Sequence, residues 1–252
     1  MNAIMFWKTL VFTSCIVMIF SLVSRSSQLP ASSQQTYTSE VRFSVKQSPA
    51  DVAPNGDLSK SYWQKADFVE FDQDAWGKSR YPELSTDVEC LWTNAYIYFG
   101  FRGRYDSLNI YDGEDPLPER WQLWNRDVVE VFLNPQPDRM LHYYEFEVAP
   151  NNQWVDLEID KSKDTFNGAS WNSGFEHATH IDAKNHIWTT EMRILLSSMN
   201  VSAIHAGAKW RANFFRAAGQ GDDRRKFLAW SIIPGGKTFH APTRFGVLEL
   251  VN

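Results

Sequence analysis

The chain has 252 residues, of which 43% are hydrophobic, enough for one domain with a sizeable core. Its formal net charge of −5 argues against a nucleic-acid partner, because phosphate binding depends on clustered lysine and arginine. Aromatic residues make up 15% of the chain and include 11 tryptophans. Since a buried indole N–H needs a hydrogen-bond partner, this surplus indicates that some of the rings line a surface.

Residues 1–23 have the order of a secretory signal. A positive charge at Lys8 precedes an uncharged apolar run, and polar residues follow. The run is short for a transmembrane helix, which needs roughly 20 residues. An uncleaved anchor is the alternative interpretation, because Ser24-Arg25-Ser26 is a poor cleavage site. Residues 24–40 then resemble a polar linker. We therefore expect an exported protein (periplasmic, extracellular or on the outer surface) that meets a membrane only through a possible N-terminal anchor.

From residue 41 onward, apolar and polar residues alternate with a period of two, which is typical of half-buried strands. The expected strands cover residues 87–92, 96–102, 128–133, 143–148, 155–159, 175–181, 187–194, 209–216, 226–232 and 245–250. Residues 63–66 and 194–199 are expected to form short helical turns. We therefore predict an all-β fold, a two-sheet antiparallel β-sandwich of jelly-roll or immunoglobulin-like type, as a single domain over residues 41–252.

Cys90 is the one cysteine outside the predicted signal, so we expect no internal disulfide bond. It alternates with Val88 and Trp92 along a predicted strand. This pattern predicts that Cys90 is a small buried hydrophobic residue.

Three segments carry a resemblance to a known family. They are Trp124–Leu133, Trp210–Arg216 and Phe239–Gly246. In their order and spacing they resemble the family 9 carbohydrate-binding modules and their DOMON-like relatives. That family has a tryptophan, a short spacer and Asp-x-Val-Glu-hydrophobic-Phe at the first segment, and an aromatic-x-x-Pro-x-x-Phe-Gly ending at the third. The resemblance covers residues 41–252.

The resemblance implies a β-sandwich that clamps the end of an oligo- or polysaccharide between two aromatic rings and supports polysaccharide capture or breakdown. Trp124 matches the first clamp ring, and Phe239 falls at the second, which is usually a tryptophan. Glu130 matches the glutamate that binds sugar hydroxyls. Asn213 falls on or near a polar strand residue beside the sugar, and Arg216 is a further candidate for sugar contact.

The strand pattern supports Glu130 independently. If residues 127–133 form a strand, Glu130 shares a face with Val128 and Phe132. A carboxylate among apolar neighbours needs hydrogen-bond donors, and sugar hydroxyls are good donors. The alternative is that Glu130 pairs with an arginine such as Arg216 and only holds two strands together.

The sequence departs from the family pattern at two positions. Glu147 stands near Phe146, where a basic residue is expected, and Gly236 falls near an expected asparagine. The aromatic residues of the clamp are partly present and the hydrogen-bonding residues differ from those of the family. The sequence therefore does not identify the sugar or its linkage. An alternative interpretation is a structural or partner-binding sandwich with a degenerate sugar site.

Rows of carboxylates leave glycoside hydrolysis as a second alternative. Glu145 and Glu147 share one strand face, as do Asp156, Glu158 and Asp160. Acidic rows on the solvent face of a sheet are common, however, and the sequence marks no member as desolvated. We therefore expect a non-catalytic protein.

We expect no cofactor, and the sequence leaves two alternatives. The acidic loop 111–116 could hold a structural calcium ion, because hard cations need clustered carboxylate oxygens, although a plain acidic turn is favoured. Some DOMON-like sandwiches bind a b-type haem, which would make the protein an electron carrier. Met140, His142 and Met192 are the available haem ligands.

Overall fold

Twelve strands and six short 3₁₀ turns form the part of the chain that this computed structural model describes, residues 40–112, 118–163, 168–220 and 224–252. The strands are β1 (Arg42–Gln47), β2 (Phe68–Phe71), β3 (Thr86–Trp92), β4 (Tyr96–Arg104), β5 (Val128–Asn134), β6 (His142–Val148), β7 (Trp154–Asp160), β8 (Glu176–Asp182), β9 (Ile187–Leu195), β10 (Lys209–Ala218), β11 (Lys226–Ala229) and β12 (Gly246–Val251). The 3₁₀ turns are η1 (Trp63–Lys65), η2 (Pro82–Leu84), η3 (Leu123–Asn125), η4 (Gly168–Ser170), η5 (Leu196–Met199) and η6 (Pro242–Arg244).

Some of the sequence predictions lie outside the described residues. These are the signal over residues 1–23, the linker apart from Glu40, and residues 113–116 of the acidic loop. The described residues belong to the unit Ser39–Asn252.

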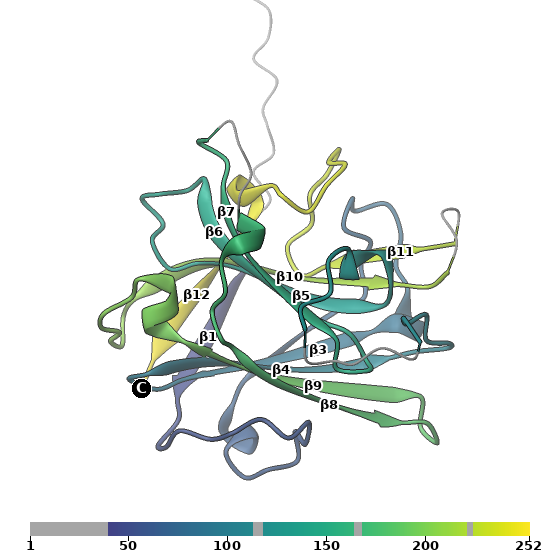
Figure 1. Cartoon of the computed structure of the whole chain (residues 1–252), viewed down its shortest axis with the longest axis horizontal. Helices are drawn as coiled ribbons and strands as arrows, with labels where there is room; N and C mark the ends of the chain where they lie inside the picture. The colour runs from purple at the N-terminus through teal and green to yellow at the C-terminus, as the bar shows by residue number, and fades with distance from the viewer. Residues whose placement is uncertain (1–39, 113–117, 164–167, 221–223) are drawn as a thin grey trace, which may run out of the picture. The chain divides into compact units, whose positions relative to one another are not determined.

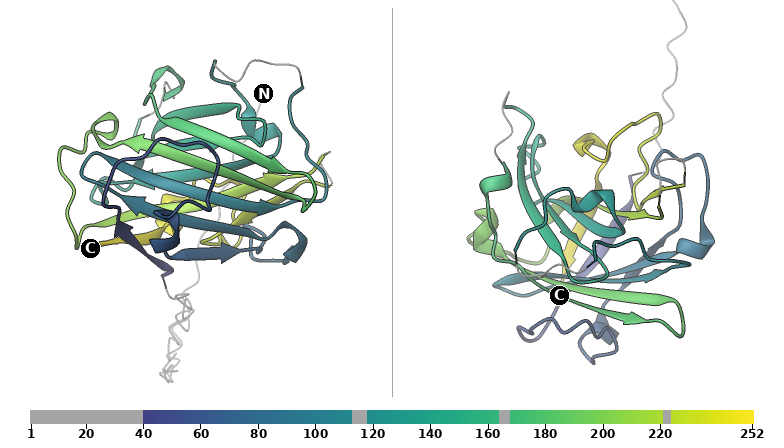
Figure 2. Two further views of the ribbon diagram at one scale, coloured as in Figure 1. Left: turned by 90° about the horizontal axis from the view of Figure 1, so that it is seen from below. Right: turned by 45° about the vertical axis from the view of Figure 1, so that its right-hand side comes forward.

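The strands form a sheet that curls into two facing layers, in the order β7-β6-β5-β10-β12-β1-β3-β4-β9-β8 (Figure 1; Figure 2, right). We call β5, β6, β7, β10, β11 and β12 the first layer, and β1, β2, β3, β4, β8 and β9 the second layer. Within them β11 pairs with β10, and β2 pairs with β3. The prediction of an all-β, sandwich-like fold is confirmed.

Strand β1 makes the two layers continuous. It pairs in parallel with β12 and with β3, whereas the other strand pairs are antiparallel. Neither β1 nor β2 was among the strands expected from the sequence. The four residues of β2 are too few for alternation to stand out from the surrounding loops, whereas β1 does alternate, with Phe43 and Val45 buried, and its signal was missed.

The main core lies between the layers and follows from period-two alternation. On β10, Ala212, Phe214 and Ala218 point into it, while Phe215 and Ala217 point to the outer face of the first layer. Cys90 is a free thiol and is fully buried in this core, as predicted.

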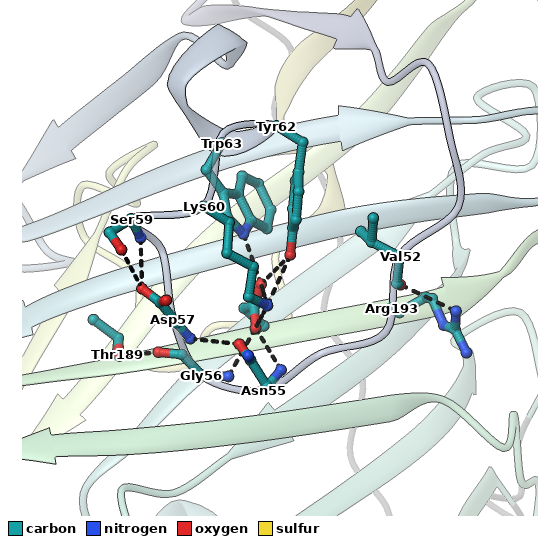
Figure 3. A network of polar contacts seen from close by, with 11 residues as sticks. Val52, Asn55, Gly56, Asp57, Ser59, Lys60, Tyr62, Trp63, Thr189 and Arg193 are labelled. Atoms are coloured by element: carbon teal, nitrogen blue, oxygen red, sulfur yellow. Dashed lines mark hydrogen bonds and ion pairs between the residues drawn. The ribbon is translucent and has the colours of Figure 1, made fainter.

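The outer face of the second layer is covered by the segment 48–66 (Figure 2, left). Leu58 and Trp63 of this segment pack on Leu91 and Tyr98 of the sheet. Gly100 permits the close approach, because a Cβ atom at this position would lie 2.7 Å from Leu58. Figure 3 shows the polar contacts that fasten the same segment to the layer.

The outer face of the first layer is covered only in part. Phe132, Tyr143 and Phe215 belong to a second hydrophobic cluster on this face, against which Trp124 and Phe239 pack from loops. The space left between those loops is the candidate site.

Candidate functional site

A cleft of about 640 Å³ lies on the outer face of the first layer. Its floor consists of Glu130 and Phe132 of β5, Glu145 of β6, and Leu157 and Ile159 of β7. These residues share one face because side chains alternate along each strand. The walls come from loops and from β11, and consist of Trp76, Trp121, Trp124, Asn125, Lys161, Arg225, Phe227, Lys237, Thr238, Phe239 and His240.

The Trp124 wall is built by the η3 turn. Gln122 enters this turn in the left-handed conformation, with φ of 64°. A guanidinium nitrogen of Arg225 on the neighbouring loop donates to the carbonyl oxygens of Trp124 and Arg126, at 2.5 and 3.1 Å. Trp121 meets Trp124 edge to face, with ring centroids 4.9 Å apart. Because its backbone is anchored, the Trp124 ring is held at the side of the cleft.

The opposite wall is a group of packed rings around Phe239. This ring stacks on Phe215 of the sheet, with centroids 4.1 Å apart and an interplanar angle of 8°. The ring centroids of Trp76 and Phe227 lie 6.0 Å and 5.9 Å from that of Phe239. The Trp76 turn is itself tied to β11, because the backbone N–H of Ala75 donates to the carbonyl oxygen of Phe227 at 2.7 Å. Phe239 is half-buried, so part of its ring remains open to the cleft.

Three carboxyl groups are buried at and below the floor of the cleft, between the aromatic walls. Glu130 lies directly opposite Glu147 in the pairing of β5 with β6. Glu130, Glu145 and Glu147 are 2%, 3% and 0% exposed. Burial, together with repulsion from the neighbouring carboxylates, raises the pKa of Glu130 and of Glu147 well above the usual value. Burial likewise raises the pKa of Glu145.

The expectation that Glu145 and Glu147 form a row on the solvent face of the sheet is therefore wrong. Alternation does place both on one face of β6, but that face is covered by the loops that carry Trp124 and Phe239. Among the described residues, Oε1 of Glu130, Oε2 of Glu145 and both carboxylate oxygens of Glu147 lack a hydrogen-bond partner. Glu130 and Glu145 therefore offer acceptors at the cleft floor, and Glu147 lies beside them.

His240 adds a neutral polar group beside Glu145. Its Nδ1 hydrogen bonds with the Tyr143 hydroxyl at 2.9 Å and lies 3.8 Å from Oε2 of Glu145. Lys161 donates to the His240 carbonyl oxygen at 2.9 Å. Burial, and then the positive charge of Lys161, lower the pKa of His240 to about 4. The imidazole is therefore uncharged near neutral pH and supplies no positive charge to Glu145.

Three of the five residues expected from the sequence meet in this cleft: Trp124, Glu130 and Phe239. Asn213 does not line it. Its amide nitrogen donates to the carbonyl oxygen of Ser231 at 2.8 Å, and its amide oxygen accepts the N–H groups of Ser231 and Phe214. Asn213 is fully buried and holds β10 to the segment that follows β11.

Arg216 lies on the other side of β10, and its expected place at the sugar is wrong. It is buried between the layers, where it donates to the carbonyl oxygen of Leu84 at 2.9 Å and to the Thr86 hydroxyl at 3.0 Å. Burial lowers the pKa of Arg216 to about 10. The alternative pairing of Arg216 with Glu130 also fails, because Glu130 is opposite Phe215 and its side chain points to the outer face.

The three candidate haem ligands lie in different environments. Met192 is fully buried in the core between the layers, whereas Met140 is 45% exposed. His142 hydrogen bonds through Nε2 to Glu158 at 2.8 Å.

Sequence reasoning missed several of the cleft residues. Trp121 and His240 are close in sequence to Trp124 and Phe239, so the motif neighbourhood could have revealed them. Trp76 had no such signal, because it reaches the site through the pairing of a distant turn with β11.

The model of the carbohydrate family 9 binding domain-like family matches residues 55–252. The chain belongs to this family. The resemblance to family 9 modules is thereby confirmed, while the DOMON-like part of the prediction is not tested. An extracellular protein of Arthroderma benhamiae is 25% identical over 195 residues, which are 73% of this chain and 85% of that protein.

Solved structures share the family 9 fold. A candidate carbohydrate-binding protein of Bacteroides uniformis is 19% identical, with a TM-score of 0.68 over 84% of this chain and 100% of its own. A family 9 module of Caldicellulosiruptor kristjanssonii in complex with cellotriose is 17% identical, with a TM-score of 0.60 over 84% and 94% of the two chains. A family 9 module of the same organism in complex with glucose is 17% identical, with a TM-score of 0.59 over 83% of this chain and 95% of its own.

Within the described part of this chain, no helix has the length and apolar character needed to cross a membrane.

Proposed function

We propose that the protein binds carbohydrate without catalysis, in the cleft between Trp124 and Phe239. The observation that carries this proposal is the combination of aromatic walls with a buried carboxylate, Glu130, whose Oε1 lacks a partner among the described residues. Family membership supports it, as do the solved relatives that hold cellotriose and glucose.

Each part of the cleft suits one part of a sugar. The apolar faces of Trp124 and Phe239 match the C–H faces of a pyranose ring. Glu130 accepts hydrogen bonds from sugar hydroxyls, and charged acceptors make the stronger hydrogen bonds. Stacking supplies the binding free energy in this arrangement, and the polar groups set the orientation of the ring.

Isothermal titration with glucose, cellotriose, xylotriose and mannotriose tests the proposal. We expect one series to bind the wild type, and Trp124→Ala to weaken its affinity about tenfold or more, since a stacked ring contributes about 1.5 kcal/mol. Phe68→Ala is the matched control, because Phe68 is an aromatic side chain that is 62% exposed on β2. Equal binding by Trp124→Ala and the wild type would place the sugar elsewhere. A wild type that binds no sugar would favour the partner-binding sandwich.

Glycoside hydrolysis is the second candidate, because Glu130 and Glu145 line the same cleft and offer oxygens within 4.8 Å of one another. Retaining glycosidases use two carboxylates about 5 Å apart. Release of reducing ends from cellotriose, lost in Glu145→Gln, would establish hydrolysis. A constant level of reducing ends together with sugar binding would support the non-catalytic proposal.

We also propose that the protein acts outside the cytoplasm. The predicted signal and the extracellular relative both support this location. Fractionation of cells that express the full chain tests it, and retention of the protein in the cytoplasm would contradict it.

A further inference from the structure

Glu130 and Glu145 of the cleft floor form a three-carboxylate group with Glu147, which is buried beside them and does not line the cleft. We call this group the acidic triad. Each member offers one carboxylate oxygen, and these oxygens lie within 4.8 Å of one another. The strand pairing explains the arrangement, because Glu130 is opposite Glu147, and Glu145 is two residues away on the same face of β6.

Glu147 is the member that points to a missing ligand. It is 0% exposed, and no described residue outside the triad forms a hydrogen bond with either of its carboxylate oxygens. One of those oxygens is directed at the space that it shares with Glu130 and Glu145. A buried carboxylate that lacks hydrogen-bond donors costs several kcal/mol, and directly opposed like charges on paired strands add to that cost. The positive charge of Arg225, which acts on Glu130 and Glu147, offsets only one of the three carboxylates.

The chemistry of the triad selects the kind of ligand. All three donors are carboxylate oxygens, the ligands that hard cations prefer. The three oxygens lie within 4.8 Å of one another, and a usual Ca–O distance is about 2.4 Å, so they are close enough to share one ion. Magnesium favours shorter bonds and retains its waters. An ammonium group would bring one positive charge to three carboxylates, whereas a calcium ion brings two.

We propose that Glu130, Glu145 and Glu147 bind a calcium ion at the floor of the cleft. Glu147 holds it from below, and Glu130 and Glu145, which line the cleft, leave coordination positions open toward the aromatic walls. Vicinal sugar hydroxyls would fill those positions, and this consequence rests on the proposed sugar-binding function.

Calcium titration of chelator-treated protein, in the absence of sugar, tests the site directly. We expect the wild type to bind one ion and to gain thermal stability as calcium is added, because a ligand that binds the folded state stabilises it. Glu147→Gln should weaken calcium binding at least tenfold. Glu83→Gln is the matched control, since it removes the same charge from an exposed residue of η2, and it should bind as the wild type does.

Two results would overturn the proposal. One is a wild type that gives neither heat nor a thermal shift up to about 10 mM calcium, well above the usual range for extracellular modules. The other is calcium binding by Glu147→Gln with unchanged affinity. Circular dichroism checks that each variant folds, and Glu145→Gln serves as the second variant if Glu147→Gln does not fold. Binding of magnesium or glucosamine in place of calcium would also reject the calcium assignment.

Sugar titrations with calcium and with chelator separate this inference from the proposed function. Calcium binding without any sugar binding would support the triad site and contradict the proposed function. Sugar binding of equal affinity in both conditions, by a protein that binds no calcium, would do the reverse. Sugar binding that requires calcium and is lost in Glu147→Gln would support both.

Discussion

Both layers have buried glutamates on their outer faces. The two faces differ in whether the chain supplies hydrogen-bond donors to the carboxylate oxygens. On the second layer, Oε1 of Glu191 accepts hydrogen bonds from the Trp63 indole at 2.7 Å and the Tyr62 hydroxyl at 2.6 Å. Its Oε2 accepts the backbone N–H groups of Asn55 and Gly56, and Lys60 lies 3.0 Å away. Figure 3 labels the donors Asn55, Gly56, Lys60, Tyr62 and Trp63. On the first layer, the acidic triad keeps oxygens without such partners in the described residues.

The pKa shifts follow this difference. Burial by itself would raise the pKa of Glu191, but the hydrogen bonds from Trp63, Tyr62, Asn55 and Lys60 outweigh it and lower the pKa. In the triad, burial and repulsion act together and raise the pKa of Glu130 and Glu147. A buried carboxylate that the chain itself satisfies stabilises the fold, whereas one left unsatisfied beside a cleft is available to a ligand.

The largest expected effect concerns the tryptophans of the two faces. Trp63 is 3% exposed, so Trp63→Ala should reduce the free energy of unfolding by about 4 kcal/mol. Trp124 is only half-buried, so Trp124→Ala should cost about 1 kcal/mol or less and act on ligand affinity instead. Urea unfolding of both variants measures this, and equal losses would show that the Trp124 ring serves as core.

Glu191→Gln tests the closed face next. The substitution removes the charge that Lys60 and four further donors satisfy, so we expect a loss of about 3 kcal/mol in the free energy of unfolding. Proteolysis within residues 48–66 should become faster, since Glu191 anchors that segment. A variant as stable as the wild type would mean that apolar packing of Leu58 and Trp63 alone holds the segment.

The same Glu→Gln substitution in the triad should change the free energy of unfolding in the opposite direction. In calcium-free buffer, Glu147→Gln replaces a carboxyl whose ionised form is disfavoured by burial and by the neighbouring carboxylates, and we expect a gain of about 1 kcal/mol in the free energy of unfolding. With saturating calcium the order should reverse, because only the wild type gains binding free energy. Thermal unfolding with and without calcium measures both, and a destabilised Glu147→Gln in chelator would contradict the comparison.

The smallest effect is on pH dependence. The pKa of Glu191 is lowered from 4.5 in the folded state, so its contribution to stability is present above that value and is lost as the pH falls below it. Wild-type stability should therefore fall between about pH 4.5 and pH 3 more steeply than that of Glu191→Gln. Urea midpoints over this range measure the slopes, and parallel slopes would show that other carboxylates control acid unfolding.

The sequence allowed the fold class and part of the site to be predicted. Alternation placed most strands and correctly put Glu130 on the face of Phe132, and the motif neighbourhood indicated Trp124 and Phe239. Alternation also predicts that Arg216 faces away from Phe215, whereas the motif position predicted Arg216 at the sugar, and the structure agrees with the alternation. For Asn213 the face was right, yet its hydrogen bonds are taken by Ser231.

The sequence by itself determined which side chains share a strand face, and it carried the motifs of the family. Only the tertiary structure decided what covers each face. The segment 48–66 closes the second layer over Glu191, while the loops of Trp76, Trp124 and Phe239 stop short of closing the first. Periodicity reports the two sides of a strand, but coverage depends on chain segments that are distant in sequence. Glu191 therefore receives its hydrogen bonds from the segment that covers it, whereas no such segment supplies donors to the acidic triad.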